Sequence, residues 1–298
     1  MQKWNQELLE QCGRQWVLAM ETTDNFSAEI RPKAEVDRHE DKNVASFSAC
    51  MGSSTARVQK AMDCIKARGY LQPDMDALDI GSGTGVFTLP FAKAYRQVTS
   101  LDISIPMQEE IRRQAAERHL ENITYITEDW RTLDVDALNM RDQFDLALCS
   151  INPRGVCSLE TLNKMNLVSR GGCCLMSFAG RRQSNHGSDL QRLILGRALG
   201  TTGGNDIIFP FNAVYHWGGE PDMAYTSVGW ERSQAPEEAV ESICFSYWRF
   251  AEITPALREK ITRYVYEHLE NGAYVDRTES LIGIMVWDAW RVKGAKAP

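Results

Sequence analysis

The sequence contains no long hydrophobic run. No stretch approaches the roughly 18 consecutive apolar residues that a membrane-spanning helix needs, and the longest candidate, Leu281–Trp287, has the length of a strand. The first residues, Met-Gln-Lys-Trp-Asn-Gln-Glu, lack the apolar core of a secretory signal peptide. These two absences predict a cytoplasmic protein with no membrane partner.

Paired cysteines and clustered histidines are also missing. None of the 8 cysteines belongs to a Cys-x-x-Cys pair, and several of them, such as Cys149, lie inside apolar runs. Four of the histidines show no metal-ligand spacing: His39, His119, His186 and His268. We therefore expect neither a disulfide framework nor a bound metal, and a reducing compartment.

Positive charge is scarce relative to negative charge. Lys and Arg total 33 against 40 Asp and Glu, which gives a formal net charge of −7. Surfaces that bind nucleic acid carry an excess of Lys and Arg, so nucleic acid is not expected as the main partner. The hydrophobic fraction of 43% and the length of 298 residues are sufficient for a sizeable core.

Short strands and helices alternate in the middle of the chain. The strands are expected at Ala77–Ile80, Val98–Leu101, Ile123–Ile126, Phe144–Cys149 and Cys173–Phe178. The helices between them are expected at Val86–Tyr95, at Ser104–Arg118, and from a cap at Ser158 to a stop at Gly171-Gly172. Strands that are apolar on both faces and separated by helices predict a parallel sheet covered on both sides.

Helical spacing precedes this region in the first twenty residues and at Thr55–Arg68, with a polar loop or lid at Glu29–Asn43 between them. After Gly200 the regular alternation of short strands and helices ends. The expected elements there are a loop at Thr201–Asn205, an ambiguous aromatic segment at Phe209–Trp217, a strand at Tyr225–Trp230, helices opening at Pro236 and at Thr254-Pro255, and a β-rich run at Leu281–Trp290.

The most informative motif is Asp79-Ile-Gly81-Ser-Gly83-Thr-Gly85, between an expected strand and an expected helix. Glycines permit a positive φ in a tight turn and let a ligand approach the backbone, and the following helix offers unpaired N–H groups. Counting Gly81 as the first residue, a dinucleotide fingerprint needs Gly or Ala as the sixth residue, and a P-loop needs Gly-Lys-Ser/Thr from that position. Residue 86 is Val, so neither motif fits.

The pattern Asp-x-Gly-x-Gly-x-Gly resembles motif I of the class I S-adenosylmethionine-dependent methyltransferases. Asp102 ends the next strand, where that family places an acid that binds the cofactor's ribose. The resemblance covers residues 77–178. It implies S-adenosylmethionine as the cofactor, S-adenosylhomocysteine as its product, and an α/β fold with a doubly wound, mostly parallel seven-stranded sheet of order 3-2-1-4-5-7-6.

The resemblance also implies a set of cofactor-binding residues. Asp129 follows the third strand, where the family commonly contacts the adenine amine, and the Trp130 ring is expected to stack on the adenine. The full set is Asp79, Gly81, Ser82, Gly83, Thr84, Gly85, Asp102, Ile103, Met107, Asp129, Trp130 and Ser150.

One core with additions explains the length better than two independent domains. Residues 1–70 are expected to form a helical cap or lid, with its helices over the cofactor end of the sheet. Residues 71–200 are expected to form the Rossmann-like core that binds the cofactor. Residues 201–298 are expected to complete the sheet and to carry helical insertions on the substrate side.

The acceptor side is less defined. The fourth strand runs into Asn152-Pro153-Arg154-Gly155, which matches only half of an Asn/Asp-Pro-Pro-Tyr/Phe motif that binds planar amino groups in one branch of the family. The catalytic candidates are Asn152, Tyr215 and His216, each with a structural alternative as a turn cap or in aromatic packing. Further candidates are the aromatic segments Phe47–Met51 and Phe211–Trp217, the thiols of Cys149 and Cys157, and the pair Arg181-Arg182.

These observations predict a methyltransferase that acts on a small-molecule acceptor by in-line displacement. Positioning can supply much of the catalysis, and a general base is needed only if the nucleophile must lose a proton. Two alternatives stay open: methylation of an RNA or protein amino group through Asn152-Pro153, and a non-catalytic relative that binds the cofactor and regulates a partner. A monomer and a homodimer are both compatible with the sequence.

Overall fold

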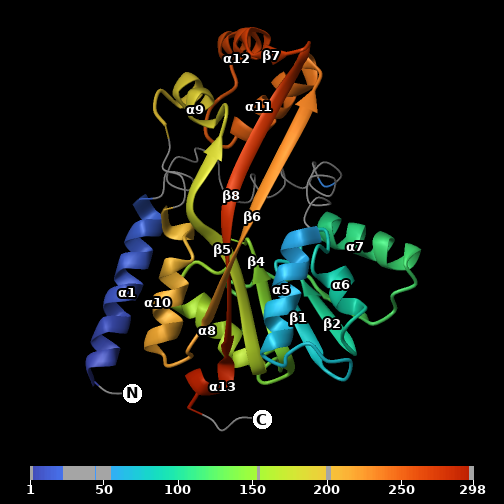
Figure 1. The fold of residues 1–298 in the computed structure, drawn as a ribbon, viewed down its shortest axis with the longest axis vertical. Helices are drawn as coiled ribbons and strands as arrows, with labels where there is room; N and C mark the ends of the chain where they lie inside the picture. The colour runs from blue at the N-terminus through green and yellow to red at the C-terminus, as the bar shows by residue number, and fades with distance from the viewer. Residues whose placement is uncertain (1–2, 23–43, 45–54, 153–154, 199–202, 295–298) are drawn as a thin grey trace.

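The computed structural model describes residues 3–22, 44, 55–152, 155–198 and 203–294. At its centre is a sheet with the strand order β3-β2-β1-β4-β5-β8-β6, and β7 pairs with β8 (Figure 1). The strands are β1 (Asp76–Ile80), β2 (Gln97–Leu101), β3 (Ile123–Ile126), β4 (Phe144–Ser150), β5 (Ser169–Ser184), β6 (Asp222–Gln234), β7 (Leu269–Glu270) and β8 (Ala273–Asp288).

Strands β1 to β5 pair in parallel, and β8 runs antiparallel to both β5 and β6. The short β7 lies off this path, so β8 corresponds to the predicted strand 7. The predicted order 3-2-1-4-5-7-6 is therefore confirmed. Two helices, α11 (Pro236–Tyr247) and α12 (Pro255–Glu267), are inserted between β6 and β8, as expected for a C-terminal helical insertion.

Helices cover both faces of the sheet. On one face, α5 (Thr55–Ala67) and α6 (Thr88–Ala92) pack Ala61, Ile65 and Phe91 against strand residues that include Leu146 and Ile284. On the other face lie α8 (Leu159–Val168), α10 (Ile208–His216) and part of α1 (Lys3–Thr22). Apolar area removed from water on both faces stabilises this three-layer arrangement.

The expected helix starts at Ser104 and Ser158 are confirmed by their caps. The Ser104 side chain accepts a hydrogen bond from the backbone N–H of Met107 at the start of α7 (Ile105–Glu117). Ser158 and Thr161 form a reciprocal capping box at the start of α8. Such caps satisfy backbone N–H groups that a helix leaves unpaired in its first turn.

The placement expected for the N-terminal helices is wrong. Helix α5 lies along one face of the sheet, because Ala61 and Ile65 are fully buried in that core. Helix α1 packs on α10: the Trp16 ring stacks on Phe209, and its indole N–H donates to the Gly204 carbonyl over 2.8 Å. The loop or lid expected at Glu29–Asn43 lies outside the described residues.

Three strands are longer than expected and extend beyond the rest of the sheet (Figure 1). We call residues 179–184 of β5, 228–234 of β6 and 274–281 of β8 the arm. At its far end, α9 (Gly187–Leu195), α11 and α12 form a small lobe with its own apolar cluster, which includes Leu190, Val240, Ile261 and Tyr274.

Several boundaries need correction. Gly171-Gly172, expected to stop a helix, lie in β5, and the expected β-rich run ends at Asp288, where α13 (Ala289–Val292) begins. The expected helix Val86–Tyr95 is helical only over α6. Phe209–Trp217 is resolved in favour of helix α10, and residues 203–205 of the expected loop form the 3-10 turn η3 (Gly203–Asn205).

Candidate functional site

The glycine turn lies where β1 ends. Gly81, Gly83 and Gly85 have φ values of +68°, +53° and +87°. The N–H groups of Gly81 and Ser82 both donate to the Leu101 carbonyl, and the Ser82 and Ser100 hydroxyls are 2.7 Å apart. These contacts fix the turn to the end of β2, so the turn and the acid that follows β2 belong to one rigid unit.

Asp102 follows β2 and faces this turn. Its Oδ2 accepts a hydrogen bond from the Gly83 N–H over 2.8 Å, and its Oδ1 accepts from the Ser104 N–H over 2.8 Å. Gln108 holds the same corner from α7, since its amide donates to the Ile126 carbonyl. The sequence-predicted acid is therefore next to the predicted glycine turn, with a fixed side-chain orientation.

Asp79 lies beneath the turn and has no access to solvent. Its Oδ2 accepts a hydrogen bond from the Thr88 hydroxyl over 2.6 Å, which ties β1 to α6. The pKa of Asp79 is raised to about 7, chiefly by burial; the Thr88 hydrogen bonds oppose the shift, and the negative charge of Asp102 adds to it. Asp79 thus supports the turn from below, and its carboxyl is not presented at the surface of the site.

Asn152 reaches the turn from the end of β4. A Cβ built on Gly81 would lie 2.0 Å from Asn152 Nδ2, so only glycine fits at position 81 with Asn152 in this place. Asn152 Oδ1 accepts the Gly155 N–H over 2.9 Å, and Ile151 before it has a φ of +48°. Pro153 and Arg154 lie outside the described residues.

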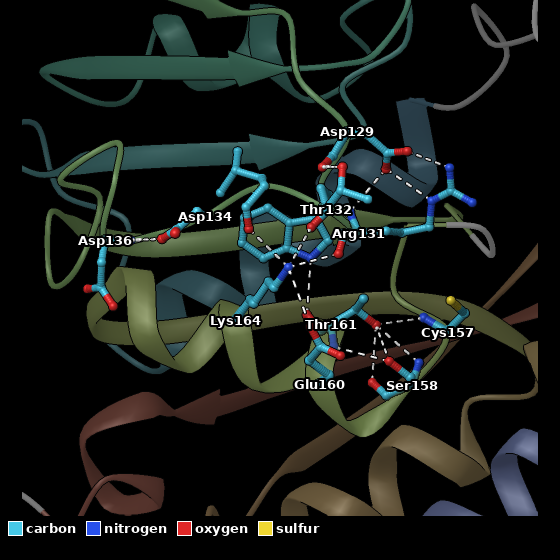
Figure 2. Close-up of polar contacts among 12 residues, drawn as sticks. Asp129, Arg131, Thr132, Asp134, Asp136, Cys157, Ser158, Glu160, Thr161 and Lys164 are labelled. Carbon is cyan, nitrogen blue, oxygen red and sulfur yellow. Dashed lines mark hydrogen bonds and ion pairs between the residues drawn. The ribbon is translucent and has the colours of Figure 1, made fainter.

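The segment after β3 carries Asp129 (Figure 2). The Arg131 guanidinium pairs with the Asp129 carboxylate through both of its oxygens, and the Arg131 N–H donates to Oδ1 over 3.0 Å. Asp129 also begins a turn, because its carbonyl accepts the N–H groups of Thr132 and Leu133. Its carboxylate is only partly buried and is held in a defined orientation.

Helix α8 holds this segment in place. Lys164 Nζ donates to three backbone carbonyls, those of Trp130, Arg131 and Leu133, over 3.3, 2.9 and 3.0 Å (Figure 2). Sequence reasoning missed Lys164 and Arg131. Nothing in the local pattern distinguishes a lysine that reaches a remote loop from one that points into solvent.

Trp130 does not lie where the sequence predicted. The side chain is 2% exposed, packs in the core on the α8 face, and donates its indole N–H to the Thr161 carbonyl over 3.0 Å. The ring is thus enclosed by the protein, and the expectation that it stacks on adenine is wrong. An exposed apolar side chain at this edge is Ile103, directly after Asp102, at 48% exposure.

These residues fit the cofactor implied by the sequence. The glycine turn and the Asp102 carboxylate are adjacent and joined through the Gly83 N–H, and the Asn152 amide fills the space that a Cβ would take at Gly81. Ile103 offers an apolar surface beside Asp102. Three other predicted contacts lie nearby in the chain. Thr84 belongs to the glycine turn after β1, Ser150 is the last residue of β4, and Met107 lies in the first turn of α7.

Tyr215 and His216 lie elsewhere. They end α10, which begins beside Phe178 and runs toward α13 (Figure 1). Their ring contacts are with each other and with Phe211, and Tyr215 is 62% exposed. The structure therefore does not bring them to the glycine turn, and their proposed catalytic roles have no support. Phe47–Met51 lies outside the described residues.

The remaining sequence-predicted candidates are two cysteine thiols and a pair of arginines. Cys149 is fully buried, and burial raises the pKa of its thiol far above the ordinary value. The pKa of Cys157 is raised by burial as well. Neither thiol is thus poised as a thiolate nucleophile. Arg182 lies in the arm, and the Arg181 side chain is outside the described part of the chain.

The described residues contain neither a cluster of metal ligands nor a membrane-spanning helix. No three His, Cys, Asp or Glu residues come together there as ligands for a metal ion. None of the helices in those residues is long and apolar enough to cross a membrane.

Comparison with known families identifies the central region. Residues 77–166 match the family model of a methyltransferase domain. The match covers β1 to α8, and therefore includes the glycine turn, Asp102, Asp129 and Asn152. A search of curated proteins gave no significant match.

Several solved structures are similar to this chain at low sequence identity. A proposed methyltransferase from Bacillus halodurans is 14% identical, with a TM-score of 0.52 over 78% of this chain and 99% of that one. YcgJ from Bacillus subtilis is 17% identical, with a TM-score of 0.45 over 76% and 98% of the two chains. A proposed sarcosine dimethylglycine methyltransferase from Galdieria sulphuraria is 13% identical, with a TM-score of 0.45 over 79% and 86%. The first likeness shows the fold and nothing about the acceptor.

Proposed function

Because this chain is a class I S-adenosylmethionine-dependent methyltransferase, we propose that its methyl acceptor is a small molecule. The observation that carries the proposal is the position of the arm. Strands β1 and β4 end level with Leu175 and Met176 of β5, whereas β5 continues to Ser184. The arm thus carries the lobe out beyond the edge at which the glycine turn lies, and leaves less room there for a macromolecule.

The charge of the chain supports the same proposal. A net charge of −7 does not favour a nucleic acid as the methyl acceptor, because its phosphate backbone is also negatively charged. The partial Asn152-Pro153 motif gives little support to amino-group methylation. The second Pro and the aromatic residue of the full motif are absent, since Arg154 and Gly155 follow Pro153.

The proposed roles of the site residues follow from their places. Bound S-adenosylmethionine supplies a methyl group on a cationic sulfur. Gly81, Gly83 and Gly85 let the ligand lie against the backbone, and Asp102 accepts hydrogen bonds from the ribose hydroxyls. Asp129 accepts from the adenine amine, and Ile103 covers the ring. The remaining task of the protein is to hold the acceptor in line and to exclude water.

We keep the predicted division of the chain as part of this proposal. Residues 71–200 provide the cofactor half, residues 201–298 complete the sheet and carry the substrate-side lobe, and residues 1–70 are an N-terminal helical addition to this core. Cytoplasmic location is proposed on the composition alone.

The test is the transfer of labelled methyl groups into fractions of a cell extract. We expect label in the small-molecule fraction, and its loss when the variant Asp102→Ala replaces the wild-type protein. Label confined to RNA or protein would overturn the proposal in favour of a macromolecular acceptor. Cofactor binding without transfer to any fraction would favour the regulatory alternative.

A further inference from the structure

One face of β8 changes from apolar to polar and back along its length. Alternate residues of a strand share a face. On the face toward α5, Ile282, Ile284 and Val286 join the core of the sheet, and Tyr274 joins the core of the lobe. Between these two apolar cores the same face carries Asp276, Thr278 and Ser280. A polar window thus interrupts an otherwise continuous apolar stripe.

Two hydroxyls of this window are buried. Thr278 is 4% exposed and Ser280 is 1% exposed. Ser280 Oγ has no hydrogen-bond partner among the described residues. Buried polar groups nearly always have partners, and an exception calls for an explanation such as a ligand that the structure does not contain.

A cation and an aromatic ring flank these hydroxyls. Arg182 of β5 is directly opposite Ser280, and Trp230 of β6 is directly opposite Thr278. Residues directly opposite in antiparallel strands point to the same side of the sheet. The Arg182 guanidinium lies over the Trp230 ring, 5.3 Å from its centroid, so the two side chains meet across β8 above the hydroxyls.

The window lies between the lobe and the edge of the sheet at which the glycine turn lies. Ser150, the last residue of β4, is opposite Met176, which is opposite Ile284 of β8. Ser280 is four residues farther along β8, about 13 Å at the usual rise of a strand. A small acceptor with one end near Asn152 and the other in the arm would span this distance.

The charges around the window favour an anionic group. Arg182 supplies a cation on this face of β5, and a guanidinium presents donors in a fork that matches a carboxylate. Asp276 lies at the lobe end of the window, two residues beyond Thr278. An anion therefore fits at the Ser280 end, away from that carboxylate.

We propose that Arg182, Trp230, Thr278 and Ser280 form a subsite that binds a carboxylate of the methyl acceptor. This proposal rests on the proposed function, since it assigns the acceptor's chemical class to the same edge of the sheet. Binding requires Arg182 to move off the hydroxyls far enough for the carboxylate to accept from both Arg182 and Ser280.

The test uses the full-length protein saturated with S-adenosylhomocysteine and a panel of carboxylates, from acetate to decanoate together with benzoate. Ligand-detected NMR measures the Kd of each acid and of its neutral amide. We expect at least one acid to bind at least tenfold more tightly than its amide. We expect Arg182→Gln to weaken that acid at least tenfold, and Arg182→Lys and Ser280→Ala to weaken it by smaller factors.

The matched control is Arg112→Gln, which removes another guanidinium that lies over a ring, that of Tyr125 at 3.7 Å, on α7. It should leave acid binding unchanged. Absence of binding by every acid, equal binding of acid and amide, or equal binding to the wild type and both Arg182 variants would each overturn the subsite. Binding of S-adenosylhomocysteine, measured separately for every variant, shows whether the methyltransferase assignment itself has failed.

Discussion

At the scale of single residues, Gly81 of the glycine turn is tightly constrained. Gly81 combines a positive φ with a neighbour, Asn152, that leaves no room for a Cβ. A residue with a side chain costs about 1–2 kcal/mol in such a conformation, and the clash adds to that cost. The turn therefore requires glycine for two independent reasons.

The variant Gly81→Ala should lose at least tenfold in affinity for S-adenosylhomocysteine, because the turn and the Asn152 side chain must move apart to accommodate the methyl group. Isothermal titration calorimetry measures this change. The matched control is Gly69→Ala, where φ is +82° and no atom lies within 4 Å of the added Cβ. Gly69→Ala should lower the free energy of unfolding by about 1–2 kcal/mol and leave the affinity unchanged. Equal affinities of the two variants would contradict this reading of the turn.

Asp79 makes the stability of the protein depend on pH in an unusual direction. Its folded pKa of about 7 lies above the ordinary value of 3.8. Between about pH 4 and pH 7 the folded chain keeps this proton while the unfolded chain loses it, so this group's contribution to the free energy of unfolding falls as pH rises.

The variant Asp79→Asn removes that titration and keeps an oxygen that can accept from Thr88. The free energy of unfolding should therefore decline less between about pH 4 and pH 7 in the variant than in the wild type. Urea unfolding at a series of pH values measures both slopes. Identical slopes would show that Asp79 does not titrate in this range.

The orientation of the Trp130 ring could not be predicted from the sequence. Its position after β3 was predicted correctly, but the direction of its ring depends on Thr161, which is 31 residues away and accepts its N–H. Asp102, by contrast, was placed correctly beside the turn because adjacent parallel strands end at the same edge.

At the scale of elements, α8 acts as the platform for the segment that carries Asp129. Lys164 donates to three carbonyls of that segment, so it orders the loop without touching the proposed cofactor site itself. Lys164 is thus a positioning residue that acts through Asp129.

The variant Lys164→Met keeps the apolar stem and removes the donors. We expect an affinity for S-adenosylhomocysteine that is roughly tenfold lower, or about 1.4 kcal/mol, and we expect this penalty to shrink in the background of Asp129→Asn. Calorimetry on the four proteins of this double-mutant cycle measures the coupling. Lys260→Met, on the exposed side of α12, is the control. Fully additive effects would reduce Lys164 to a general structural role.

The central strands were predictable because their signal is local. Strand β3 has the predicted ends, and β1 and β2 differ from the prediction by one residue each. Apolar runs between glycine or polar breaks define such strands without reference to their partners.

The long strands were not predictable from local pattern. The arm part of β5 includes Arg181, Arg182 and Gln183, which are typical of a loop, and it is a strand because it pairs with β8. Gly171-Gly172 lie inside β5 because the Tyr70 ring occupies the space that side chains would need, with a Cβ at Gly172 only 2.3 Å from it. Both features depend on residues far apart in the sequence.

At the scale of the whole molecule, the arm separates two apolar cores. Ile261 is fully buried in the core of the lobe and has no part in the cores that flank the sheet. A substitution in the core of the lobe can therefore weaken the lobe without disturbing the glycine turn. Such a substitution tests the role of the lobe separately from that of the glycine turn.

The variant Ile261→Ala should destabilise the lobe by about 2–5 kcal/mol. We expect unchanged affinity for S-adenosylhomocysteine but reduced transfer of labelled methyl groups into the small-molecule fraction of an extract. Leu138→Ala, an exposed apolar residue outside the lobe, is the control. Unchanged methyl transfer by Ile261→Ala would show that the lobe has no role on the acceptor side.

The central claim, that the glycine turn and Asp102 hold S-adenosylmethionine, is tested most directly by calorimetry with S-adenosylhomocysteine. We expect saturable binding to the wild-type protein and binding that is about 100-fold weaker in Asp102→Ala, because a carboxylate that accepts from two ribose hydroxyls is lost. Asp136→Ala, which removes an exposed carboxylate paired with Arg141, should bind like the wild type. No binding to the wild-type protein at millimolar ligand, or equal binding to Asp102→Ala, would contradict the assignment.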